Sequence, residues 1–150
     1  SYTTAPSSIR AMRMRPSYLP PLHSAAPVLA RYASRLMQKD GGNIINITDS
    51  GADCNWTGYA AYTLSKSALQ HLTRLLARTL APAIRVNAIA PGLVLPPPEM
   101  PKAEWHRLVD RLPLQHAAQP NNINQAVEYL LKNMHVTGQT LVVDGGYQLL

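Results

Sequence analysis

The chain contains a single cysteine, Cys54, so no disulfide can form within it. A lone thiol is typical of a reducing compartment, and we expect a cytoplasmic protein. We interpret Cys54 as a loop thiol rather than a nucleophile, and we predict no metal site. No apolar run approaches the ~18 residues that a membrane-spanning helix requires, so no membrane partner is expected either.

Acidic residues are scarce: 8 stand against 14 lysines and arginines, which gives a formal net charge of +6. Half of this excess lies in residues 1–20, which contain Arg10, Arg13 and Arg15 and no acid. The other basic residues are scattered, without a basic stripe interleaved with aromatics, so we predict no nucleic-acid partner. Residues 1–21 are rich in proline, serine and threonine, and we expect an irregular flank there.

The rest of the chain alternates between strand and helix patterns, and 150 residues suffice for one domain with a buried core. Apolar residues recur at helical spacing over 24–39 and 59–80. Shorter helices are predicted over 101–111 and 121–132, the second with Asn121 or Asn122 as its N-cap. Apolar, β-branched runs predict buried strands within 41–49, 84–92 and 136–146, and residues 93–98 are predicted to form a loop. This order predicts a parallel α/β fold.

Tyr62 and Lys66 lie four residues apart on the second long predicted helix, which places them on one face. A free tyrosine titrates near ~10 and is a poor proton donor at neutral pH. A neighbouring ammonium stabilises the phenolate and lowers the pKa, so this pair is suited to general acid or base catalysis. Helical pairs of this type also occur by chance, so the surrounding motifs decide whether this pair is interpreted as catalytic.

Those motifs are the glycine-led strand ending in Asn46-Ile47-Thr48-Asp49, the segment Asn87-Ala88-Ile89-Ala90-Pro91-Gly92, and the late segment Val143-Asp144-Gly145-Gly146. Together with Tyr62 and Lys66, in this order and spacing, they resemble the short-chain dehydrogenase/reductase family over residues 22–150. The resemblance implies a partial Rossmann-like, doubly wound parallel sheet. It also implies that Tyr62 donates a proton as hydride reaches the substrate, and that Lys66 lowers the pKa of Tyr62 and binds the nicotinamide ribose.

Asp49 stands thirteen residues before Tyr62, where most members of that family carry serine. An aspartate there looks like the pteridine reductase and dihydromonapterin reductase branch, which implies NADPH and a dihydropterin, of the dihydromonapterin or dihydrofolate type. Asp49 would orient Tyr62 or the substrate and help to relay a proton. Ser50 is the alternative, as the usual serine displaced by one; we prefer Asp49 because a shift of one residue turns a side chain to the other face. A strand-end aspartate can also simply cap the next turn.

The resemblance also implies cofactor and substrate contacts. Pro91, Gly92, Leu93 and Val94 would lie against the nicotinamide carboxamide, although the threonine that often follows in relatives is absent. Trp56 and Tyr59 are candidates to stack on a flat heteroaromatic substrate, with ordinary packing as the alternative. His23 falls where many relatives have an asparagine of the proton relay, but we interpret it as a residue at a helix start.

No glycine-rich turn follows a first strand, as pyrophosphate binding in doubly wound folds requires. Gly41-Gly42 and Gly145-Gly146 do not replace it. We therefore expect a fragment that corresponds to the C-terminal catalytic half of a reductase, with impaired activity and weak NADPH binding on its own. The alternatives are a non-catalytic, oligomerising remnant and a 3-oxoacyl thioester or sugar reductase. The family resemblance further implies a homo-oligomer formed through the helices near 24–39 and 59–80.

Overall fold

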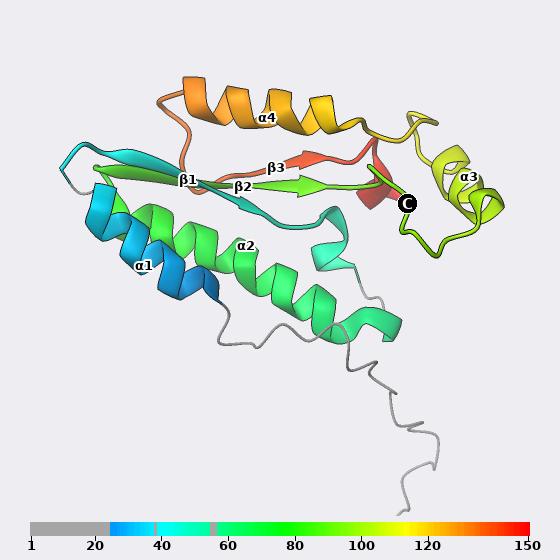
Figure 1. Cartoon of the computed structure of the whole chain (residues 1–150), viewed down its shortest axis with the longest axis horizontal. Coiled ribbons are helices and arrows are strands. Elements are labelled where there is room, and N and C mark those ends of the chain that lie inside the picture. Colours follow the sequence, from blue (N-terminus) through cyan, green and yellow to red (C-terminus); the bar gives the residue numbers. More distant parts are fainter. Residues whose placement is uncertain (1–24, 38, 55–56) are drawn as a thin grey trace, which may run out of the picture.

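The computed structural model describes residues 25–37, 39–54 and 57–150, and its centre is a three-stranded parallel sheet (Figure 1). The strands β1 (Gly42–Ile47), β2 (Ile84–Pro91) and β3 (Thr140–Val143) lie side by side in that order. Ile47 pairs with Ile89, and Pro91 pairs with Val143. Because the strands are parallel, all three end at the same edge of the sheet, where open α/β folds bind ligands.

Helices cover both faces of this sheet (Figure 1). The helices α1 (Ala25–Met37) and α2 (Ala60–Leu80) lie on one face, and α4 (Pro120–Lys132) lies on the other. A short helix, α3 (Lys102–Asp110), follows the loop after β2 at the carboxyl edge. The predicted α/β class with a partial doubly wound sheet is confirmed. None of the helices that the structure describes has both the length and the apolar character needed to cross a bilayer.

Two apolar clusters fill the space on either side of β2, because successive side chains of a strand point to opposite faces. Towards α1 and α2, Ala77, Ile84 and Val86 form one buried cluster. Towards α4, Ile89, Ala126 and Leu130 form the other. Both faces of β2 are therefore dry, which explains its nearly continuous apolar sequence.

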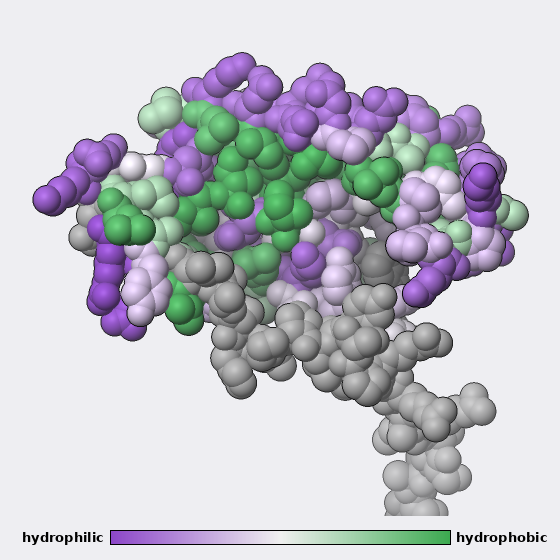
Figure 2. Space-filling model, in the orientation of Figure 1, coloured by the Kyte–Doolittle hydropathy of each residue, from purple (hydrophilic) through white to green (hydrophobic). Residues whose placement is uncertain are grey.

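The strand β1 is an edge strand, since it pairs with β2 on one side only within the described residues. Its residues Ile44 and Ile45 are half-buried and Ile47 is 48% exposed. Figure 2 shows apolar surface in the region where Figure 1 draws β1, below the hydrophilic outer side of α4. An apolar sheet edge of this kind is a surface on which further chain can pair.

The turn that leads into β1 depends on a glycine. Gly41 has φ +76°, and its N–H donates to the carbonyl of Met37 at 2.8 Å, which closes the end of α1. A Cβ at this position would lie 3.0 Å from the carbonyl oxygen of Ala83. Both the left-handed conformation and the close approach favour glycine.

Two details differ from the sequence-based expectations. The N-cap position of α4 is Gln119, not Asn121 or Asn122, because Pro120 already occupies the first helical turn. Asn122 instead accepts the N–H of Gln119 at 2.7 Å from within that turn. The third strand is shorter than its motif: only Thr140–Val143 pairs with β2, while Val136 to Gln139 form the connection from α4. As predicted, residues 93–98 form no helix or strand.

Candidate active site

The end of β1 places Asp49 at the carboxyl edge of the sheet. Thr48 fixes this end, because its N–H and its hydroxyl both donate to the carbonyl of Ile89, at 2.8 and 3.1 Å. The chain then enters a short 3-10 helix, η2 (Ser50–Asp53), with Asp49 as its N-cap. One carboxylate oxygen of Asp49 accepts the N–H of Gly51 at 2.7 Å. The capping role considered for Asp49 is therefore present.

The second carboxylate oxygen of Asp49 accepts the hydroxyl of Tyr62 at 2.6 Å. The same aspartate thus caps a turn and holds the phenol. Ser50, the alternative to Asp49, makes no hydrogen bond to Tyr62: its hydroxyl is buried and has no hydrogen-bond partner among the described residues. The structure therefore brings Asp49, and not Ser50, to Tyr62.

Lys66 lies one helical turn after Tyr62 on α2. Its ammonium stands 5.7 Å from the centre of the Tyr62 ring and donates to the carbonyl of Ile47 at 3.2 Å. An ammonium has three N–H donors, so this bond leaves donors for a ligand. Asp49, Tyr62 and Lys66 thus form one cluster at the ends of β1 and α2.

The expected lowering of the Tyr62 pKa by Lys66 is wrong for this structure. Burial raises the pKa of Tyr62 well above its usual value, and both the hydrogen bond to Asp49 and the charge of that carboxylate raise it further. The reason is geometric, because the carboxylate accepts the hydroxyl directly while the ammonium lies over the ring. In this state the phenol keeps its proton and is a weaker acid than a free tyrosine.

The segment Pro91 to Val94 lies at the same sheet edge. The N–H of Gly92 donates to Val143 at 3.0 Å, and the carbonyl of Leu93 accepts Ala118 at 2.8 Å, which fixes the loop at both sides. The N–H groups of Leu93 and Val94 and the carbonyl of Val94 make no hydrogen bond with any other described residue. A carboxamide needs donors and acceptors of this kind, so this segment fits the nicotinamide end of a dinucleotide, as do the remaining donors of Lys66.

Of the two residues proposed to contact the substrate, the structure describes only Tyr59. Trp56 lies outside the described residues, as does His23. Tyr59 ends the short 3-10 helix η3 (Thr57–Tyr59) just before α2, and its side chain is 62% exposed. Its role in substrate binding stays a prediction.

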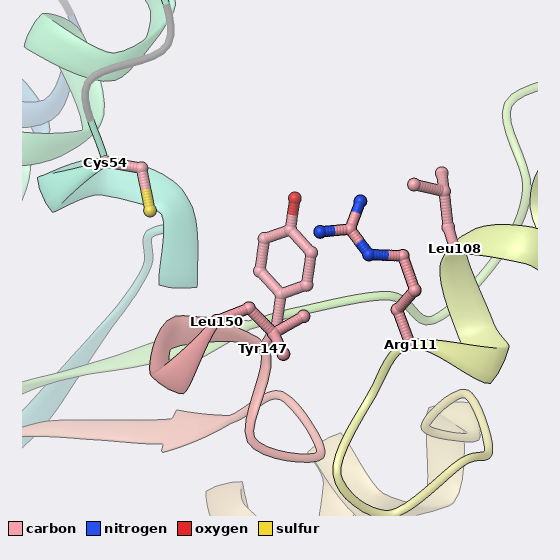
Figure 3. A pocket seen from close by; sticks show the side chains of 5 residues that line it. All are labelled: Cys54, Leu108, Arg111, Tyr147 and Leu150. Carbon is pink, nitrogen blue, oxygen red and sulfur yellow. The ribbon is translucent and has the colours of Figure 1, made fainter.

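Sequence reasoning missed a pocket of about 280 Å³ at this edge of the molecule (Figure 3). It is lined by Cys54, Leu108, Arg111, Tyr147 and Leu150. Burial raises the pKa of Tyr147, Cys54 and Asp49 raise it further, and Arg111 opposes them. The position of Tyr147 directly after the Asp144-Gly145-Gly146 turn, at the carboxyl end of β3, is the sequence signal that was available.

Comparisons with known proteins show the family to which the chain belongs. The family described as Enoyl-(Acyl carrier protein) reductase matches residues 22–148. A dihydromonapterin reductase of Klebsiella pneumoniae is 34% identical over 85% of this chain and 55% of its own length. Carbonyl reductase family member 4 of Danio rerio is 40% identical over 79% of this chain and 50% of its own length.

A solved structure also matches the fold of this chain. The FolM alternative dihydrofolate reductase 1 of Brucella suis, solved in complex with NADP, matches with a TM-score of 0.75 and 39% identity. The match covers 83% of this chain and 51% of that one. The chain therefore spans about half the length of the relatives that it matches.

Proposed function

Because the chain belongs to the short-chain dehydrogenase/reductase family, we propose that Asp49, Tyr62 and Lys66 serve the NADPH-dependent reduction of a dihydropterin, of the dihydromonapterin or dihydrofolate type. The observation that carries this proposal is the 2.6 Å hydrogen bond from Tyr62 to Asp49. The similarity to a dihydromonapterin reductase and to a dihydrofolate reductase solved with NADP supports the choice of substrate and cofactor.

The chain's own residues perform three tasks in this proposal. Tyr62 holds a proton that it gives up only when negative charge develops on the substrate atom, because Asp49 and burial disfavour the phenolate. Asp49 orients the hydroxyl and relays the proton. Lys66 and the backbone of Leu93 and Val94 would hold the nicotinamide end of NADPH, which supplies the hydride when bound.

The exposed edge of β1 indicates where the part of the protein that binds the pyrophosphate and adenosine of NADPH would lie. No glycine-rich turn between a first strand and a helix occurs in the described residues, so they offer no site for the pyrophosphate. We propose that an amino-terminal, adenosine-binding half pairs along β1 in the active enzyme. This arrangement would also cover the apolar surface of that strand (Figure 2).

The test is a fusion that joins the amino-terminal half of the Brucella suis relative to residue 22 of this chain. Cooperative unfolding establishes that the fusion folds, and the loss of NADPH absorbance measures turnover of dihydromonapterin and dihydrofolate. We expect turnover, and we expect Tyr62→Phe to reduce it by about 100-fold or more, since general acid catalysis typically contributes ~10²–10⁴. Tyr129→Phe, on the exposed side of α4, is the matched control and should leave turnover unchanged.

Carbonyl reduction is the second candidate function, because a carbonyl reductase is 40% identical over 119 residues. Asp49 discriminates between the two. Asp49→Ser should lower dihydropterin turnover and leave NADPH affinity nearly unchanged. Faster turnover of a 3-oxoacyl thioester than of dihydropterins by the unaltered fusion would favour the second candidate, and a folded fusion that binds no NADPH would favour the non-catalytic remnant.

We also propose that the protein is a cytoplasmic homo-oligomer that associates through α1 and α2. On α1, Val28, Tyr32 and Leu36 recur every fourth residue and are 52%, 60% and 83% exposed. On α2, Leu64 is 65% exposed. Leu36→Glu should shift the mass measured by light scattering towards a monomer, while Arg35→Ser, on the same turn, should not.

A further inference from the structure

The pocket beside the active site is built by three segments that are distant in the sequence (Figure 3). Cys54 closes the 3-10 helix that Asp49 begins. Leu108 and Arg111 come from the end of α3. Tyr147 belongs to the last 3-10 helix, η4 (Tyr147–Leu149), which packs against η2. The pocket is thus connected to the Asp49 turn through Cys54.

The walls of this pocket have two chemical characters. Leu108 and Leu150 supply apolar surface, whereas Tyr147 and Arg111 supply a phenol and a guanidinium. In Figure 3 the hydroxyl of Tyr147 and the guanidinium of Arg111 point into the same space, with the sulfur of Cys54 facing them from the other side. An aromatic group attached to a polar or charged end fits walls of this kind.

Arg111 is the cationic group of the pocket, and it is exposed. The one ion pair within the described residues joins Lys132 to Glu128, and no described residue accepts a hydrogen bond from the guanidinium of Arg111. Its five N–H donors form a planar fork that matches the two oxygens of a carboxylate. A guanidinium that faces a pocket and forms no ion pair with a described carboxylate has the donors to bind an anionic ligand.

The pocket's position restricts which part of a ligand it takes. Its volume of about 280 Å³ lies at the small end of ligand pockets, which span ~300–1,000 Å³, so it suits a side chain rather than a whole substrate. Tyr147 belongs to η4, which contacts the η2 turn that Asp49 caps, and its ring shares the pocket with Arg111. A substrate held at Tyr62 would thus extend past Tyr147 towards Arg111.

We infer that Arg111 binds a carboxylate at the end of the substrate's side chain, so that the enzyme prefers dihydropterins of the folate type to dihydropterins with a neutral polyol side chain. This inference rests on the proposed function. Folates end in an aromatic amide and glutamate carboxylates. The aromatic ring would pack against the apolar walls, and a carboxylate would bind the guanidinium. Neutral side chains leave Arg111 without an anionic partner.

The experiment measures binding to the 150-residue chain by calorimetry with three probes: folic acid, hydroxymethylpterin and para-aminobenzoylglutamate. We expect Arg111→Ala to weaken folic acid and para-aminobenzoylglutamate about tenfold and to change hydroxymethylpterin less than about twofold, as expected for one lost charged hydrogen bond. Arg111→Lys should recover part of the loss. Arg107→Ala removes the same charge from the same helix outside the pocket and should change none of the three affinities.

The outcomes separate this inference from the function on which it rests. If Arg111→Ala leaves folic acid binding unchanged, or if it weakens all three probes equally, the carboxylate site is excluded while pterin binding stands. If para-aminobenzoylglutamate binds through Arg111 but neither pterin binds, the anion site is supported and the pterin assignment fails. Absence of binding by all three probes would overturn the inference about Arg111, while turnover by the fusion tests the proposed function separately.

Discussion

The hydroxyl of Tyr62 donates a 2.6 Å hydrogen bond to one carboxylate oxygen of Asp49, while the other oxygen accepts the N–H of Gly51 at 2.7 Å. The aspartate is therefore held by the turn that it caps and can hold the phenol in turn. The cap holds the carboxylate of Asp49 in one orientation. The negative charge therefore stays next to the hydroxyl of Tyr62.

Asp49→Asn should lower the pKa of Tyr62 towards the ordinary value, because it removes the charge that opposes ionisation. Tyrosine carbon shifts in NMR, with Tyr62→Phe for assignment, would measure this. Asp53→Asn, in the same short helix but exposed, is the control and should leave the pKa in place. An unchanged pKa in Asp49→Asn would mean that burial alone raises it.

The same shift predicts how stability depends on pH. The pKa of Tyr62 is higher in the folded state than the ~10 of an unfolded tyrosine, so the folded state binds this proton more tightly. Its contribution is fully present below pH ~10 and is lost as the pH rises towards the folded pKa. Urea unfolding above pH ~10 should therefore show a steeper loss of stability in the native sequence than in Tyr62→Phe.

Gly92→Ala should destabilise the site and the sheet together. A Cβ at Gly92 would lie 2.6 Å from the Cβ and 2.7 Å from the Cα of Asp144, and neither the strand end nor the turn can move freely. Overpacking of this kind typically costs ~1–3 kcal/mol of unfolding free energy. Gly58→Ala is the matched control, because within the described residues no atom beyond its chain neighbours lies within 4 Å of its Cβ position. Equal melting temperatures of the two variants would show that the turn relaxes.

Asn87→Ala should cost about 1–3 kcal/mol of unfolding free energy, because it removes both hydrogen bonds of a fully buried amide and leaves the N–H of Gln139 without this acceptor, while the carbonyl of Val136 still accepts from Arg85 at 3.0 Å. Asn87 is fully buried; its amide donates to the carbonyl of Val136 at 2.9 Å and accepts the N–H of Gln139 at 3.0 Å. These bonds join β2 to the connection between α4 and β3. Asn124→Ala, on the exposed side of α4, should stay within ~0.5 kcal/mol in urea unfolding.

Leu130→Ala and Leu131→Ala test the packing of α4 with the same chemical change at adjacent positions. Leu130 is 1% exposed and lies in the cluster with Ile89, whereas Leu131 is 50% exposed. We expect Leu130→Ala to lower the unfolding free energy by ~2–5 kcal/mol and Leu131→Ala by much less. Similar losses would place α4 differently on the sheet.

The 150-residue chain by itself should bind NADPH only weakly. The described residues offer groups for the nicotinamide end, such as Lys66 and Val94, but no glycine-rich turn for the pyrophosphate. Calorimetry with the chain and with the fusion proposed above would compare the two. Micromolar affinity of the chain alone would contradict this prediction.

Much of the fold follows from local patterns. The helix over 59–80 was predicted nearly to its ends, because apolar residues recur at one helical face and Pro82 follows its end. Parallel strands were predicted because short β-branched runs alternate with helices. The N-cap of α4 was not predicted correctly. Asn121 and Asn122 are residue types that often cap helices, but the helix starts earlier because Pro120 occupies its first turn.

The sequence by itself determined which residues form the cluster at the site. Tyr62 and Lys66 share one face because a helix repeats every 3.6 residues, and Asp49 follows a strand that ends at the same edge. The family, the fold class and the identity of these three side chains follow from motifs that are local in the sequence.

Only the tertiary structure decided the electrostatics of the site and the existence of the pocket. Whether Lys66 or Asp49 controls the pKa of Tyr62 depends on which group lies at the hydroxyl, and spacing along a chain does not specify that distance. Arg111 and Tyr147 lie 36 positions apart and share a pocket with Cys54 because α3, η4 and η2 pack together. No local pattern encodes that packing, because it arises from contacts between segments that are distant in the sequence.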